Sequence, residues 1–376
     1  MTTFDKTIDI LYVFNEGRSQ KLNKTSDFSN EFFYYFYHFK KDGYKTDYIE
    51  IQTKFLTKEK KFLRIVEKFI RKTFSLPFYG SKLLSEENIN KLGQSKHIVL
   101  TNETAIYSTL FYFLKNKKLI NAKTTIFLMG ITDSSTNYFY KMFKKKLNKL
   151  IFKLHDNILF LSSNEKNYAS KNYLNFKSKM QYFPFLVDQD FWSFKSKKLK
   201  KDDYILFIGN DKNRDYFFLK ALANLLKDYR FLFISNNIEL ENFSSPNVSI
   251  IKGDWRKGYL TDKQLLNYYL NAKISIIPLK NSKQPSGQSV AMQSMSAGTT
   301  VIITETDGFW DPIIFKNNEH IFKIKTNDLK KWSQKIEDLF QDDLKLEKVS
   351  LNAKNVLRKN YDQQKYYEVL KNLIFN

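Results

Sequence analysis

Short apolar runs alternate with longer amphipathic segments along the whole chain. Runs of this length, rich in isoleucine, valine and phenylalanine, predict buried strands. They fall at 8–14, 46–51, 97–101, 125–129 and 157–162, then at 204–209, 230–235, 248–252, 274–279 and 299–304. The segments between them have helical spacing, among them 28–41, 216–227, 261–271, 328–340 and 364–375. A repeated strand–helix alternation predicts parallel sheets with helices on both faces.

The alternation is interrupted by a charged run, 195–203 (KSKKLKKDD), which suits a linker between domains. A chain of 376 residues is long enough for two domains with cores of their own. We therefore predict an α/β protein with two doubly wound, Rossmann-like domains facing a cleft. The N-terminal domain takes residues 1–197 and the C-terminal domain takes residues 203–361.

The stretch 274–311 combines a strand, a polar loop, a helix and a second strand. Gly287 stands at the loop–helix junction, where free N–H groups and the helix dipole attract an anion. Ser286, Ser289 and Gln293 follow the spacing i, i+3, i+7 and are expected on one helix face. With Gln288 in the first turn, that face would offer hydroxyl and amide groups to a phosphate and a sugar diol. The alternative is an ordinary βαβ unit with a polar solvent face.

A second glycine, Gly209, closes the strand at 204–209 and precedes a helix. Asn210, Lys212 and Arg214 follow it, and basic groups beside a glycine at this position suit a diphosphate. Arg214 is the preferred clamp and Lys212 the second choice. The alternative is plain surface charge for both residues.

The formal net charge of +23 is compatible with nucleic acid, an anionic membrane surface or an acidic substrate. No helix-turn-helix, RNA-binding or zinc-ligand pattern is present, so we expect no specific nucleic-acid partner. With no cysteine in the chain, a disulfide or thiolate metal site is excluded. We expect no metal and no cofactor.

Two predicted helices, 58–74 and 138–155, carry an apolar stripe beside many lysines. Such helices either lie on an anionic membrane or pack on their own sheet. No apolar run approaches the roughly 18 residues that span a bilayer, and no secretory signal pattern opens the chain. We expect a cytoplasmic protein, peripheral at the inner face of the membrane.

The segment 286–303 (SGQSVAMQSMSAGTTVII) resembles the donor region of GT-B-fold retaining glycosyltransferases of the GT4 type. Their pattern there is approximately E-A-M-A-x-G-x-P-V-I. Gln293 stands where the family often has a glutamate that binds ribose hydroxyls, and a second family glutamate would fall at Pro285. Both departures put the usual carboxylate pair in doubt.

The resemblance implies a nucleotide-sugar donor in the C-terminal domain, with retention at the anomeric carbon and no required metal. The loop Gly253, Asp254 and Trp255 would lie near the base. It implies a saccharide or lipid-linked acceptor in the other domain, faced by the loop of Asn15, Glu16 and Gly17; the alternative is that this loop is a plain turn. The final helix, about 362–376, would cross back to the N-terminal domain. Cell-surface polysaccharide, lipopolysaccharide or glycolipid synthesis is the implied pathway.

Further acceptor-side candidates follow the strands at 97–101 and 125–129, because ligands bind at the carboxyl ends of parallel strands. They are Asn102, Glu103 and Gly130. The family often has a histidine near the second position; here Thr132 and Asp133 are the nearest polar groups. They are weak catalytic candidates, and the sequence assigns no catalytic base.

Other functions on the same fold remain open. A nucleotide-sugar epimerase would be expected to bring a richer set of histidines and carboxylates to the cleft. This chain has four histidines, and none stands at a motif position. A phosphorylase would carry a lysine bound to pyridoxal phosphate. A catalytically degenerate protein that binds sugar, membrane or a partner is favoured by Gln293 and the missing carboxylates.

Overall fold

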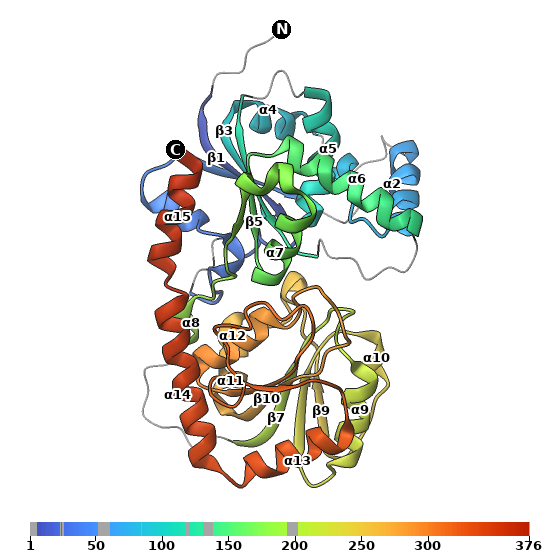
Figure 1. Ribbon diagram of the computed structural model, residues 1–376, viewed down its shortest axis with the longest axis vertical. Helices are drawn as coiled ribbons and strands as arrows, with labels where there is room; N and C mark the ends of the chain where they lie inside the picture. Colours follow the sequence, from blue (N-terminus) through green and yellow to red (C-terminus); the bar gives the residue numbers. More distant parts are fainter. Residues whose placement is uncertain are drawn as a thin grey trace. The chain divides into compact units, whose positions relative to one another are not determined.

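The computed structural model describes residues 6–22, 24, 26–51, 61–83, 85–116, 121–130, 138–193 and 202–375. The chain forms two compact units (Figure 1). Unit 1 holds residues 1–23, 32–184 and 364–376, and unit 2 holds residues 24–31 and 185–363. The chain therefore changes unit at four places. The predicted linker 195–203 lies almost entirely outside the described residues.

Unit 1 contains a six-stranded parallel sheet in the order β2-β1-β3-β4-β5-β6. Its core gathers the apolar side chains of the strands and of α5. The strands are β1 (Ile8–Asn15), β2 (Thr46–Ile51), β3 (Ser95–Leu100), β4 (Lys123–Leu128), β5 (Asn157–Phe160) and β6 (Met180–Tyr182). The helices are α1 (Phe36–Lys41), α2 (Lys61–Phe74), α3 (Gly80–Leu83), α4 (Glu86–Gln94), α5 (Glu103–Asn116), α6 (Tyr138–Leu154), α7 (Ser163–Asn172) and α15 (Gln363–Phe375).

Unit 2 repeats this design with a six-stranded parallel sheet in the order β12-β11-β10-β7-β8-β9. Helices α9 and α13 pack on one face, and α11 and α12 lie on the other (Figure 1). The strands are β7 (Asp202–Ile208), β8 (Arg230–Ile234), β9 (Val248–Ile251), β10 (Ala272–Ile277), β11 (Thr300–Thr304) and β12 (Phe322–Ile324). The helices are α8 (Gln189–Trp192), α9 (Tyr216–Leu225), α10 (Ile238–Glu241), α11 (Asp262–Asn271), α12 (Gln288–Ala297), α13 (Leu329–Phe340) and α14 (Asp343–Asn360).

The predicted α/β class, with two doubly wound units, is confirmed, and local sequence signals explain the ends of several elements. Thr261 and Gln264 form a capping box at the start of α11. Gly298 ends α12 in the left-handed conformation, with φ of 83°. Helices α5 and α14 have no counterpart among the predicted elements.

The single helix predicted over 28–41 is wrong. A short 3₁₀ turn, Glu31–Phe33, is followed by Tyr34 and Tyr35 at φ of 48° and 67°, and only then does α1 begin. Tyr12 donates its hydroxyl to the carbonyl of Tyr34 at 2.9 Å, which holds the break in place. The segment before the break belongs to unit 2.

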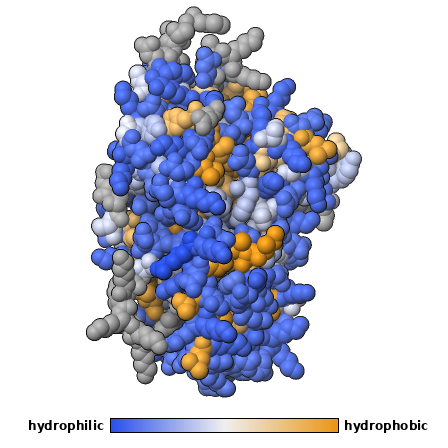
Figure 2. All heavy atoms as spheres, turned by 60° about the vertical axis from the view of Figure 1, so that its left-hand side comes forward, coloured by the Kyte–Doolittle hydropathy of each residue, from blue (hydrophilic) through white to orange (hydrophobic). Residues whose placement is uncertain are grey.

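The face drawn in Figure 2 is dominated by polar residues, with small hydrophobic patches among them. None of the described helices is both long and apolar enough to cross a membrane.

Candidate functional site

The carboxyl ends of β7, β8 and β9 are tied together by one side chain, Asn210. Its Nδ2 donates to the carbonyl of Gly253 at 2.6 Å. Its Oδ1 accepts from the backbone N–H of Asn236 at 2.6 Å and from Ser235 Oγ at 3.1 Å. The amide of this predicted ligand residue is thus used to fix the loops at the sheet edge.

Arg214 is buried, with 3% of its surface exposed, although it follows a surface turn. Its backbone forms a bridge with Leu279, just after β10. Its guanidinium packs on Gly209, where an added Cβ would stand 2.4 Å from Nε. Nη1 lies 3.2 Å from Asp211 Oδ2, while Nε has no hydrogen-bond partner among the residues that the structure describes. A buried cation with an unused N–H suits an anion.

Gly287 places the start of α12 beside that guanidinium. A Cβ on Gly287 would lie 3.5 Å from Arg214 Nη1 and 2.8 Å from Ile277 Cγ2. Its φ of 78° also favours glycine. Ser286 Oγ accepts from Asn213 Nδ2 at 2.7 Å, which ties this loop to the β7–α9 loop. The structure thus brings Gly209, Arg214 and the N-terminus of α12 together.

Ser286 lies outside α12, which begins at Gln288, so only Ser289 and Gln293 of the predicted face lie on the helix, at i and i+4. Gln288 and Gln293 are buried, and Ser289 is half-buried. Gln293 donates its Nε2 to Glu31 Oε1 at 2.8 Å and accepts from the Tyr269 hydroxyl at 3.0 Å. Its amide is occupied at both ends inside unit 2.

The other predicted donor residues lie at the rims of these loops. Lys212 is exposed. Asp254 is buried, and its carbonyl accepts from the N–H groups of Lys257 and Gly258 at 3.1 Å each. Trp255 is half-buried and donates its indole N–H to Asp262 Oδ2 at 3.4 Å.

Glu31 is a buried carboxylate that the sequence reasoning missed. It accepts from Trp192 Nε1 at 3.0 Å and from the backbone N–H of Asp188 at 3.2 Å, in addition to Gln293. Burial, and next the charge of Asp262, raise the pKa of Glu31 to about 7. The only sequence signal was a lone carboxylate inside the aromatic run 28–37.

Close to Glu31 in the sequence, Ser29 fastens the same segment to α11. Its N–H and its hydroxyl donate to Asp262 Oδ2 at 2.9 and 2.8 Å. Residues 24–31 therefore join unit 2 through two buried carboxylates, Glu31 and Asp262.

In unit 1, the predicted loop after β1 is ordered by its own polar groups. Asn15 Oδ1 accepts from the N–H of Glu16 at 2.9 Å, and Gly17 has a φ of 99°. Arg18, which is buried, donates to the carbonyl of Asn15 at 3.1 Å. Glu50 on β2 accepts from the backbone N–H groups of Arg18 and Ser19.

A second group of predicted residues meets at the ends of β3 and β4. Glu103 Oε1 accepts from the N–H of Met129 at 2.7 Å, and Glu165 Oε1 accepts from that of Gly130 at 2.8 Å. Burial raises the pKa of Glu103 to about 7. Asn102 Oδ1 caps α5 by accepting from the N–H of Ala105 at 3.0 Å. Thr132 and Asp133 lie outside the described residues.

Within the described part of the chain, no cluster of three or more histidine or carboxylate groups is placed to hold a metal ion. The residues gathered at the site supply charge and hydrogen bonding. Arg214 and the N-terminus of α12 converge on one place in unit 2, which is suited to a phosphate-bearing ligand.

Comparisons with known proteins agree with this geometry. Residues 202–342 match the family model described as Glycosyl transferases group 1. No curated protein sequence matches the chain.

Solved structures share the fold at low sequence identity. A glycosyltransferase from Rickettsia africae ESF-5 is 14% identical with a TM-score of 0.66, and the alignment covers 98% of this chain and 99% of that one. Sucrose-phosphate synthase from Thermosynechococcus elongatus is 12% identical with a TM-score of 0.66, over 97% and 98% of the two chains. Anabaena Alr3699/HepE in complex with UDP and glucose is 10% identical with a TM-score of 0.62, over 98% and 100%. The family match in unit 2 and the shared two-unit fold together support a GT-B glycosyltransferase.

Proposed function

We propose that the protein transfers a sugar, with retention, from a nucleotide-sugar donor held in unit 2 to a saccharide or lipid-linked acceptor held by unit 1. The observation that carries this proposal is the buried Arg214 between Gly209 and Gly287 at the start of α12. The family match over 202–342 and the UDP-bound neighbour support the nucleotide.

In the proposed sugar transfer, unit 2 has to hold the diphosphate leaving group. When the bond between the sugar and the diphosphate breaks, negative charge grows on the phosphate oxygens. Arg214 and the N–H groups of α12 are fixed before the reaction, so they stabilise this charge with little reorganisation. We propose that this electrostatic role replaces a metal ion.

We infer that unit 1 binds the acceptor at the ends of β1, β3 and β4. Asn15, Glu16 and Gly17 line the first loop, while Glu103 and Gly130 stand at the others. A lipid-linked acceptor would bring this unit to a membrane, and the adjoining helices α2 and α6 fit that partner.

Helices α2 and α6 lie side by side: the rings of Phe74 and Phe143 are stacked with their centroids 4.5 Å apart. Tyr140 donates its hydroxyl to the carbonyl of Phe74 at 3.0 Å. Both helices leave large apolar side chains in solvent, including Phe69 at 62% exposure and Phe139 at 80%. Both also carry lysines, and α6 has no acidic residue. We propose an anionic lipid surface as the partner of this α2–α6 face, at the cytoplasmic side.

The test is binding of nucleoside diphosphates and nucleotide sugars to the whole chain by calorimetry. We expect one base to bind, and Arg214→Gln to weaken that binding roughly tenfold or more, as expected for a charge-assisted contact. Transfer with the selected donor should then leave the anomeric configuration unchanged and survive EDTA. The absence of binding by every nucleotide and nucleotide sugar would overturn the proposal.

A catalytically degenerate protein is the second candidate. Two features favour it. Helix α12 has no carboxylate to offer a donor, and the amide of Gln293 is already bonded to Glu31 and Tyr269. This candidate predicts nucleotide or sugar binding without turnover. Measurement of nucleotide release with acceptor present separates the two.

A further inference from the structure

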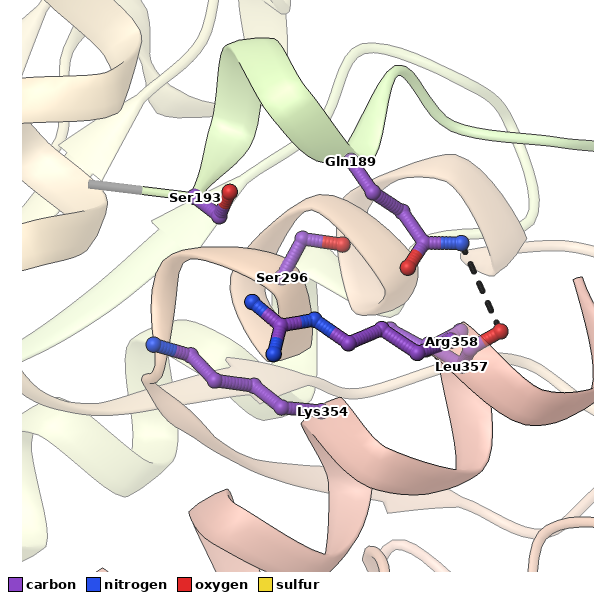
Figure 3. Close-up of a pocket in the computed structure, with 6 residues that line it drawn as sticks. All are labelled: Gln189, Ser193, Ser296, Lys354, Leu357 and Arg358. Carbon is purple, nitrogen blue, oxygen red and sulfur yellow. Dashed lines mark hydrogen bonds between the residues drawn. The ribbon is translucent and has the colours of Figure 1, made fainter. Parts of the chain in front are cut away.

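Unit 2 contains a polar recess that is separate in its lining from the Arg214 site. It is a small, half-open recess, and Arg358 in its lining is exposed. Figure 3 shows side chains from the α8 segment, α12 and α14 around the same space. They are Gln189, Ser193, Ser296, Lys354, Leu357 and Arg358.

The lining has two positive charges and no acidic residue. Lys354 and Arg358 stand one turn apart on α14, where like charges repel. Neither side chain has an ion-pair or hydrogen-bond partner among the residues that the structure describes. Burial, and then the charge of Arg358, lower the pKa of Lys354. An anion would relieve both costs.

A buried hydroxyl in the same recess is also unsatisfied. Ser296 is 3% exposed, and within the described part of the chain its Oγ has no hydrogen-bond partner. Lys354 lies beside Gly298, so the dipole of α12 balances part of its charge. Arg358 and Ser296 remain the donors without a partner, and an unmade buried hydrogen bond is costly.

Gln189 adds an acceptor to these donors. Its Nε2 donates to the carbonyl of Tyr361 at 2.8 Å and to that of Leu357 at 3.4 Å (Figure 3). Its Oε1 is then left to accept a hydrogen bond. A set of cations, a hydroxyl donor and one acceptor matches an oxyanion that carries a proton, such as hydrogen phosphate.

We propose that this recess binds a small phosphate-type anion through Lys354, Arg358 and Ser296, with Gln189 accepting from the P–OH group. The bound anion would link α8, α12 and α14. It would therefore connect the helix that starts at Gly287 with the two segments, 185–193 and 343–363, at which the chain changes unit. The proposal is independent of the proposed function.

The test uses the full chain and inorganic phosphate, with chloride at equal ionic strength as the reference. Phosphate should raise the melting temperature of the wild type by binding the native state. Lys354→Gln and Arg358→Gln should each weaken phosphate binding about tenfold, and Ser296→Ala should weaken it without any change of charge. Lys348→Gln makes the same charge change on an exposed part of α14 and should bind like the wild type.

Arg214→Gln separates this recess from the nucleotide site. We expect the Arg214→Gln protein to keep phosphate binding, whether or not nucleotides bind to the wild type. Loss of phosphate binding in Arg214→Gln, with normal binding in Lys354→Gln and Arg358→Gln, would overturn the proposal. So would a wild-type protein that shows no phosphate-dependent shift. Circular dichroism of each variant establishes that the fold is retained.

Discussion

The guanidinium of Arg214 rests directly on the backbone of Gly209, so close that a Cβ on that glycine would stand 2.4 Å from Nε. The two residues therefore act as one feature of the site. A side chain at position 209 would expel the cation, although position 209 itself carries no charge.

We predict that Gly209→Ala weakens nucleotide binding to a similar extent as Arg214→Gln, roughly tenfold or more. In Gly209→Ala the new methyl group displaces the buried guanidinium, and in Arg214→Gln the guanidinium is removed. Isothermal titration calorimetry with the best-binding nucleotide measures both. Lys227→Gln, an exposed charge change in unit 2, is the control. Normal affinity in Gly209→Ala would mean that Arg214 does not contact the ligand.

Gly287→Ala should lower both stability and nucleotide affinity. The residue has a φ of 78°, and its new Cβ would lie 2.8 Å from Ile277 Cγ2. Gly258 has a φ of 66° with nothing within 4 Å, so Gly258→Ala shows the backbone cost alone. That cost is about 1–2 kcal/mol. In denaturant unfolding, the unfolding free energy of Gly287→Ala should be clearly lower than that of Gly258→Ala. Equal losses of unfolding free energy in the two variants would contradict the predicted clash with Ile277.

Glu31 predicts a pH dependence of stability. Its pKa is raised to about 7 in the folded protein from 4.5. Because the folded value is the higher one, its contribution is fully present below about pH 4.5 and is lost as the pH rises through about 7. The loss amounts to at most about 3 kcal/mol. Unfolding free energies between pH 4.5 and 8 should fall more steeply for the wild type than for Glu31→Gln. If the unfolding free energies of the wild type and of Glu31→Gln changed with pH in parallel, the pH dependence would come from a group other than Glu31.

Gln293→Glu tests why an amide stands at this position. Its Nε2 donates to Glu31 Oε1 at 2.8 Å, and a carboxylate could not donate there. The variant would place two acids in contact in a buried site, at an expected cost of about 3–5 kcal/mol at neutral pH. Melting temperatures should recover toward the wild type at pH 5, where the pair shares a proton. A variant as stable as the wild type at pH 8 would contradict this interpretation.

The α2–α6 face predicts binding to anionic vesicles. Replacing Ile65, Phe69 and Phe139 with serine removes exposed apolar groups and leaves every charge in place. We expect co-sedimentation with phosphatidylglycerol vesicles to weaken roughly tenfold or more, because membrane affinity depends on buried apolar area. Phe217→Ser, at an equally exposed position on α9, is the control. Unchanged binding in the triple variant would exclude this face.

Much of this fold could be predicted from the sequence because buried parallel strands are short, continuous apolar runs. The run 46–51 matches β2, and 230–235 differs from β8 by one residue. The break at Tyr34 and Tyr35 could not be predicted, because it depends on Tyr12 and on the docking of residues 24–31 in unit 2. An aromatic run has the same helical spacing whether or not its backbone turns.

In the candidate site, too, some features could be predicted from local sequence and others could not. Gly209, Arg214 and Gly287 could be selected from local signals, because Gly209 closes a strand, Arg214 follows it closely, and Gly287 stands at the start of a helix. Gln293 could not be interpreted without Glu31, which lies 262 residues away in the sequence. Hydrogen bonds between such distant positions leave no trace in local spacing.

The passage of residues 24–31 into unit 2 and of α15 into unit 1 has a consequence for biosynthesis. During translation, the early segment has to wait for a partner that emerges more than 150 residues later. Most of unit 1 has been synthesised by residue 184, but this unit is complete only after α15 has been added. Unit 2 has all of its residues once residue 363 has emerged, so unit 1, whose synthesis starts first, is completed last.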